Sequence, residues 1–161
     1  MTGRSVWLVL CGEPERGDDA AGPIAVAGLP ADILARCEVR HGPGLDVETL
    51  LDIPLDAACV LVDAAIGIPP GEVVVVPLDE LARPTGPRPT EAAPRSSHAL
   101  PVGHVLGLVR ALRGRAPAGS FVGIGAGSAG LGADLSASVD RAMPTFREAI
   151  AAEIRRLTAP V

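Results

Sequence analysis

Carboxylates and one histidine stand at the ends of short apolar segments of this 161-residue sequence. Carboxylate and imidazole groups that converge can bind a metal ion or form a general acid–base set. Neutral imidazole with carboxylate oxygens suits nickel, zinc or iron better than magnesium, and such a set lacks the fourth ligand of a closed structural site. The candidate residues are Glu13, Glu15, Asp18, Asp19, Asp63 and His98.

Each candidate also has an ordinary structural interpretation. Asp18 or Asp19 can cap a helix, because Asp is among the preferred capping residues. Asp63 can end a strand in a turn, and His98 can be an exposed histidine near a helix N-terminus. His41 lies beside a Gly-Pro-Gly sequence and is interpreted as a turn residue, and the two loop glutamates as solvated charges. The residues alone therefore predict a candidate site but no reaction.

Short apolar segments alternate with helical patterns along the whole chain. This alternation predicts an α/β fold: a single three-layer α/β/α domain over residues 1–161, with a mostly parallel, about five-stranded twisted sheet. Ligands of such folds bind beyond the carboxyl ends of the strands, where the candidates stand. Residues 79–97 are rich in Pro, Arg and Thr and are expected to form a flexible surface loop. The expected strands are 5–11, 37–41, 58–63, 72–77 and 118–126.

Helices are expected after the first and second strands, before the last strand and at the C-terminus. One follows Asp18 or Asp19 and carries Pro23 in its first turn, and a short one has Asp46 as its cap. Another, from about residue 98 to 113, has Ser96 or Ser97 as its cap, and Ser136 caps the last. The third helix has an apolar stripe of Val102, Val105, Val109 and Leu112, and the last one of Phe146, Ile150, Ile154 and Leu157.

Composition excludes several classes of catalyst and ligand. All 14 basic residues are Arg, and the chain has no Lys, Asn, Gln or Tyr. These absences exclude a Schiff-base lysine, a Ser–Lys dyad, a tyrosine acid and an oxyanion hole built from side-chain amides. A net charge of -5 without basic runs argues against nucleic-acid binding. No apolar run approaches the ~20 residues of a membrane-spanning helix, so a cytoplasmic protein is expected.

The cysteines are odd in number and lack metal-site spacing. Cys11, Cys37 and Cys59 are expected to be small buried hydrophobes rather than disulfide or zinc ligands. One hypothesis for the function is a thiol hydrolase that uses Cys11 or Cys59 with His98. It is disfavoured because burial within a strand raises a thiol pKa.

Four blocks of the sequence, in order, resemble the nickel-iron hydrogenase maturation endopeptidases. The first is similar to the family's opening signature, a Gly-Asn dipeptide followed by a short loop, an acidic pair and a helix-starting Gly. The last is similar to its closing Gly…Leu-Ser…Val pattern. The blocks are residues 12–22, residues 61–64 with 70–73, residues 97–98 with Leu100, and residues 130–132 with 135–136 and Val139.

The resemblance implies an endopeptidase that removes a C-terminal tail from a hydrogenase large-subunit precursor after nickel insertion. It implies that Asp19, Asp63 and His98 meet the nickel, which the substrate carries, so that no resident cofactor is expected. Nickel then either polarises the water or carbonyl, or serves only for recognition while one carboxylate activates water. The expected partner is the precursor, with no nucleic acid or membrane, and the expected state is a monomer.

An alternative from another class is a non-catalytic, metal-sensing, chaperone-like module that holds the precursor without cutting it. One departure from the family pattern bears on the substrate: Glu13 stands where the family has Asn. A carboxylate only accepts hydrogen bonds, so any bond that the family's amide donates is lost.

Overall fold

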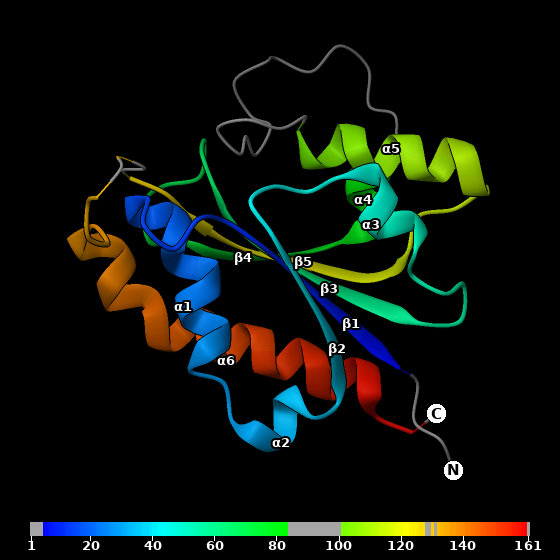
Figure 1. Ribbon diagram of the computed structural model, residues 1–161, viewed down its shortest axis with the longest axis horizontal. Coiled ribbons are helices and arrows are strands. Elements are labelled where there is room, and N and C mark those ends of the chain that lie inside the picture. The colour runs from blue at the N-terminus through cyan, green and yellow to red at the C-terminus, as the bar shows by residue number, and fades with distance from the viewer. Residues whose placement is uncertain (1–4, 84–100, 128–129, 131, 161) are drawn as a thin grey trace.

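A five-stranded sheet forms the centre of the computed structural model, which describes residues 5–83, 101–127, 130 and 132–160 (Figure 1). The strand order is β2-β1-β3-β5-β4. The first four strands in this order pair in parallel, and β4 is antiparallel to β5. The expected mostly parallel sheet is confirmed. The strands are β1 (Val6–Cys11), β2 (Cys37–Gly42), β3 (Ala58–Ala65), β4 (Val73–Pro77) and β5 (Ala118–Gly125).

Helices cover both faces of the sheet (Figure 1). One face carries η1 (Gly17–Ala20), α1 (Ala21–Ala27), α2 (Ala31–Leu34) and α6 (Ala137–Thr158). The other carries α3 (Val47–Leu51), α4 (Leu78–Ala82) and α5 (Val102–Arg113). The buried side chains form two clusters, one on each face, built mainly from Val, Leu, Ile and Ala. These are the three layers that the alternation of strands and helices predicts.

Every residue of the central strand β3 is buried. The alternation of its side chains between the two faces of the sheet decides on which face Asp63 lies. Val60 and Val62 belong to the cluster on the α1 and α6 face, whereas Cys59 and Leu61 belong to the cluster on the α5 face. Successive side chains of a strand point to opposite faces. Asp63 therefore lies on the face of the sheet that α5 covers.

The structure corrects two expectations about the segment before α5. Residues 79–82 lie in α4 rather than in the loop expected for 79–97, because Leu78 and Ala82 bury their side chains in the core. Residues 84–97 lie outside the described part of the chain. The N-cap of α5 is Pro101, with a non-helical ψ of 141°, in place of Ser96 or Ser97.

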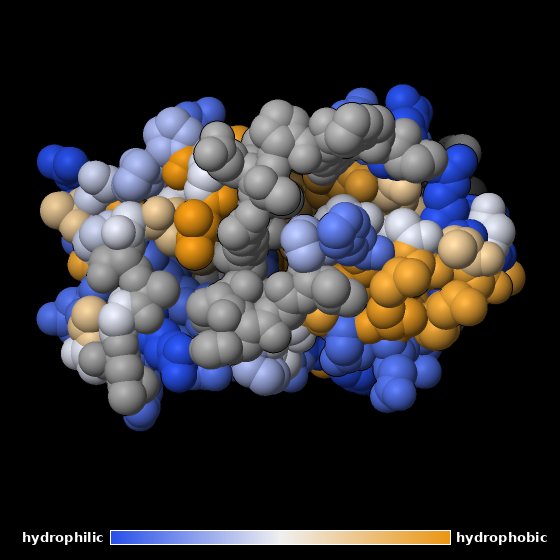
Figure 2. All heavy atoms as spheres, turned by 90° about the horizontal axis from the view of Figure 1, so that it is seen from above, coloured by the Kyte–Doolittle hydropathy of each residue, from blue (hydrophilic) through white to orange (hydrophobic). Residues whose placement is uncertain are grey.

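The apolar stripe of α5 differs by one residue from the stripe that its sequence predicts. Val102, Val105 and Val109 are buried as expected, but Leu112 is 68% exposed and Leu106 is buried instead. At 3.6 residues per turn, Leu112 lies about 80° from Val102 around the helix, at the edge of the stripe. Figure 2 shows hydrophobic side chains gathered on this face of the molecule.

Two predicted caps have different outcomes. Asp46 caps α3 as expected, with its carboxylate accepting the Thr49 N–H at 2.7 Å. Ser136 occupies the N-cap of α6, but its side chain makes no capping hydrogen bond. In α6 the residues Phe146, Ile150 and Ile154 are buried, and Leu157 packs against them, as their spacing predicts. No helix of the described residues has the length and hydropathy needed to cross a bilayer.

Candidate active site

The acidic candidates lie where the chain reverses its direction of travel across the sheet. From β1 the chain passes to β2 at one edge, and from β2 it returns to β3 on the other side of β1. The carboxyl ends of β1 and β3 thus form a topological switch point, where open α/β sheets bind ligands. Asp19 follows β1, in η1, and Asp63 lies near the end of β3.

A close backbone approach fixes Asp19 over the end of β1. Gly12 has a φ of +126°, and a Cβ placed on it would lie 2.1 Å from the carbonyl oxygen of Asp19. Only glycine fits this position. The Asp19 carboxylate Oδ2 accepts the Glu13 N–H at 2.9 Å. The turn at residues 12–17 therefore holds both the backbone and the side chain of Asp19.

Asp63 is a buried carboxyl group with an incomplete set of partners. It is 3% exposed, and its Oδ1 has no hydrogen-bond partner among the described residues. Burial, and then the charge of Asp19, raise the pKa of Asp63 to about 7, against a smaller lowering effect of the Ala64 amide. A carboxyl group with a pKa near 7 can exchange a proton at neutral pH and is suited to general acid–base chemistry.

Asp18, the neighbour of Asp19, has a different role. It is fully buried, and its Oδ2 accepts the Gly127 N–H while its Oδ1 accepts the Ser136 N–H, both at 2.7 Å. Neither Asp18 nor Asp19 caps a helix: the N-caps of η1 and α1 are Arg16 and Ala20. Asp18 instead joins the turn after β1 to the segment between β5 and α6.

Asp19 and Asp63 are close enough for the charge of Asp19 to raise the pKa of Asp63, and both carboxylates act on Cys11. The pKa of the Cys11 thiol is raised well above its ordinary value, first by burial and then by the charge of Asp63, with a smaller contribution from Asp19. His98 lies outside the described residues, so the expected trio is not tested as a set. Within the described residues, no three His, Cys, Asp or Glu side chains are gathered closely enough to hold a metal ion.

The thiols have the wrong environment for nucleophilic catalysis. Burial raises the pKa of Cys59 to about 12, and Cys11 lies among carboxylates rather than beside a cation. A reactive thiol needs the opposite, a lowered pKa and access to solvent. All three cysteines are free.

The remaining candidates of the sequence lie on the surface. His41 is exposed but belongs to β2, with its Nε2 3.0 Å from the Gly12 carbonyl oxygen, so its interpretation as a turn residue is wrong. Glu13 is not simply solvated, since its carboxylate pairs with Arg16 at 2.6 Å. Sequence reasoning missed the contact of His41 with Gly12 and the role of Asp18. No local pattern encodes either, because the partners are remote in sequence.

Comparison with known proteins finds similarity to solved structures only. Neither a family model nor a curated protein sequence matches the chain. Among solved structures, it is similar to a [NiFe] hydrogenase maturation protease, HybD, from Thermococcus kodakarensis. The identity is 27%, the TM-score is 0.62, and the match covers 96% of this chain and 99% of the other.

Further solved structures match in fold. The hydrogenase maturating endopeptidase HybD from Escherichia coli has a TM-score of 0.69 and 19% identity, over 94% of this chain and 93% of its own. The [NiFe] hydrogenase maturation protease HycI from Thermococcus kodakarensis has a TM-score of 0.61 and 22% identity, over 95% and 94%. The resemblance to the nickel-iron hydrogenase maturation endopeptidases, which the four sequence blocks predict, is confirmed over nearly the whole length of the chain.

Proposed function

We propose that this chain is an endopeptidase that removes the C-terminal tail of a nickel-containing hydrogenase large-subunit precursor. The observation that carries the proposal is the Asp63 carboxyl group, buried at the switch point beside Asp19 with an oxygen that no described residue satisfies. Burying such a group without a partner costs free energy. A site that keeps this group for a ligand offsets the cost only when the ligand is bound, and the likeness to maturation proteases supports nickel-loaded precursor as that ligand.

In this proposal Asp19, Asp63 and His98 engage the nickel that the precursor carries. The nickel belongs to the substrate. Its binding positions the scissile peptide bond at the rim of the sheet, and positioning of this kind contributes strongly to rate. His98 enters through the sequence alone, both as a candidate ligand and through the family resemblance, and it stands four residues before the first residue of α5.

Where nickel serves only for recognition and Asp63 does not bind it, the raised pKa of Asp63 favours this carboxyl group as the one that activates water. In its ionised form, the carboxylate accepts a proton from water while the water oxygen bonds to the peptide carbonyl carbon. The C–N bond then breaks, and the proton passes to the leaving amine. A base with a pKa near the working pH is the most effective for this transfer. No covalent intermediate with the protein is expected.

The test is mass spectrometry of nickel-loaded precursor incubated with Asp19→Ala, Asp63→Ala and His98→Ala variants. Each variant is expected to lose at least about 100-fold in cleavage rate, the lower range for removal of an acid–base group. Asp32→Ala and His104→Ala are matched controls, because both residues are exposed on helices. Both controls are expected to cut at the rate of the unmodified chain.

Two outcomes contradict the proposal in different ways. Full cleavage by all three variants removes Asp19, Asp63 and His98 from the mechanism. A stable complex of the unmodified chain with a precursor of intact mass identifies the chaperone-like module instead. Precursor that carries no nickel is expected to stay uncut whichever of these outcomes is found.

A further inference from the structure

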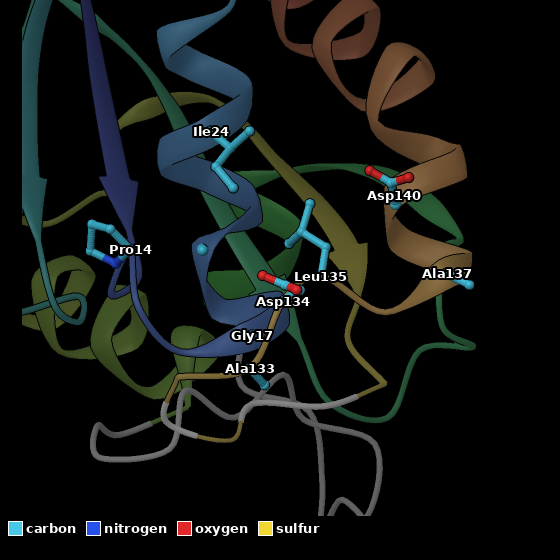
Figure 3. A pocket seen from close by; sticks show the side chains of 9 residues that line it. Pro14, Gly17, Ile24, Ala133, Asp134, Leu135, Ala137 and Asp140 are labelled. Atoms are coloured by element: carbon cyan, nitrogen blue, oxygen red, sulfur yellow. The ribbon is translucent and has the colours of Figure 1, made fainter.

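A pocket of about 540 Å³ opens on the face of the sheet opposite to Asp63, between α1 and the start of α6 (Figure 3). It lies beside the switch point, because η1 contributes to both: Gly17 and Ala20 line the pocket, and Asp19 lies between them in sequence. Its lining residues are Pro14, Gly17, Ala20, Ile24, Ala133, Asp134, Leu135, Ala137 and Asp140.

The two walls of this pocket are joined by hydrogen bonds. The Gly17 N–H donates to the Ala133 carbonyl at 3.0 Å, and the Gly132 N–H donates to the Glu15 carbonyl at 2.8 Å. Asp18 adds its bond to the Ser136 N–H. A site whose walls are already fixed loses little conformational freedom when a ligand binds.

The lining combines apolar contacts with negative charge. Ile24, 43% exposed on α1, and Leu135 face each other across the pocket (Figure 3). Asp134 and Asp140 are both exposed at its edge, and none of the described residues that line it is Arg or His. Within the described part of the chain, neither carboxylate makes an ion pair or a side-chain hydrogen bond. A long aliphatic side chain with a cationic end complements such a lining.

Other ligands fit this lining less well. An anion at the N-terminus of α6 is repelled by both carboxylates, and Asp140 in the first turn already offsets the positive end of the helix dipole. A divalent cation prefers more oxygen ligands than two carboxylates supply, and the described residues add no third acidic, His or Cys ligand.

We propose that this pocket binds an Arg or Lys side chain of the hydrogenase precursor. The aliphatic part lies against Ile24 and Leu135, and the cationic group lies between Asp134 and Asp140. This inference rests on the proposed function and deepens it. Ala20 follows Asp19 directly in η1, and consecutive Cα atoms are 3.8 Å apart. A side chain that contacts Ala20 therefore lies close to the backbone of Asp19. A basic residue held there orients the neighbouring precursor segment toward the switch point.

The first test is the double variant Asp134→Asn/Asp140→Asn with nickel-loaded precursor. We expect kcat/KM to fall about 5- to 20-fold at low ionic strength, mainly through KM, since exposed ion pairs contribute up to about fivefold each. The loss shrinks at high salt, because salt screens such pairs. Glu48→Gln in α3 together with Asp52→Asn at its C-cap is the matched control, with the same change in net charge on the other face of the sheet. An equal loss in both double variants overturns the proposal.

The second test measures binding without cleavage, so that it stands apart from the proposed activity. Each Arg or Lys of the precursor near the cut is replaced by Met, and affinity is measured for the unmodified chain and the Asp134→Asn/Asp140→Asn variant. One Met replacement in the precursor is expected to weaken its binding to the unmodified chain but not to the Asp134→Asn/Asp140→Asn variant. The pocket assignment is overturned if the precursor does not bind. It is also overturned if every replacement in the precursor weakens binding equally for the unmodified chain and for the variant. Binding of this kind without any cleavage overturns only the proposed protease activity.

Discussion

Two buried carboxyl groups, Asp18 in η1 and Asp63 in β3, differ in what surrounds them. Asp18 is fully buried, and both of its oxygens accept backbone N–H groups at 2.7 Å. Asp63 is 3% exposed, yet one of its oxygens has no partner among the described residues, and its pKa is raised to about 7. Burial alone therefore does not identify a functional carboxylate. The difference lies in whether the fold supplies hydrogen-bond donors to it.

The largest effect is expected for Asp63→Asn, which should stabilise the fold near neutral pH. The folded-state pKa of Asp63 lies above its ordinary value of 3.8, so the folded protein binds the proton more tightly than the unfolded chain. Its ionisation then destabilises the fold as pH rises from about 4 to 7, by up to about 4 kcal/mol above pH 7.

Urea unfolding at pH 8, 6 and 4 measures this difference. The gain of Asp63→Asn over the unmodified chain is expected to be largest at pH 8, smaller at pH 6 and close to zero at pH 4. The variant should at the same time fail to cut precursor. A loss of stability at pH 8 would show that the folded state satisfies the ionised carboxylate, and the contrast with Asp18 would disappear.

Asp18→Asn should have the opposite sign. An Asn side chain keeps one acceptor but presents an NH₂ group to the other backbone N–H, which leaves a buried donor unsatisfied. Hydrogen bonds to charged groups contribute about 1.5–3 kcal/mol each, so we expect a loss of about 2–3 kcal/mol in the free energy of unfolding. Asp32→Asn, at an exposed position of α2, is the control and should change stability by less than about 0.5 kcal/mol.

Thermal or urea unfolding at pH 7 provides the measurement, together with amide hydrogen exchange at Gly127 and Ser136. Protection of these two amides should fall in Asp18→Asn and remain in the control. Unchanged protection would mean that the segment between β5 and α6 is held without Asp18.

The smallest effect is expected for Glu13→Asn, which restores the residue of the family pattern. Asp19 accepts the main-chain N–H of residue 13, and this donor does not depend on the side chain. The Glu13–Arg16 pair is partly exposed, and pairs of this kind contribute about 0–1 kcal/mol. We therefore expect a stability change below about 1 kcal/mol and no change in cleavage rate, measured on the nickel-loaded precursor. A gain of tenfold or more would show that the Glu13 side chain itself impairs the site.

Sequence patterns predict the sheet well, because strand and helix periods are local properties. The apolar runs that end at Cys11 and Asp63 place a turn and a carboxylate at the correct edge of the sheet. The helical spacing of Phe146 and Ile150 predicts the buried face of α6. The same reasoning fails at Leu112, because exposure at the edge of a stripe depends on what packs against the helix.

The sequence by itself determined the fold class, the strands to within two residues at their ends, and the types of side chain gathered there. The residue pattern left Asp18 and Asp19 equivalent, and only the family resemblance singled out Asp19. The tertiary structure supplied the physical difference, since the donors to Asp18 come from residues 109 and 118 positions away, whereas Asp19 bonds to its own turn. The role of a buried carboxylate depends on which remote backbone groups reach it, and side-chain periodicity carries no information about that.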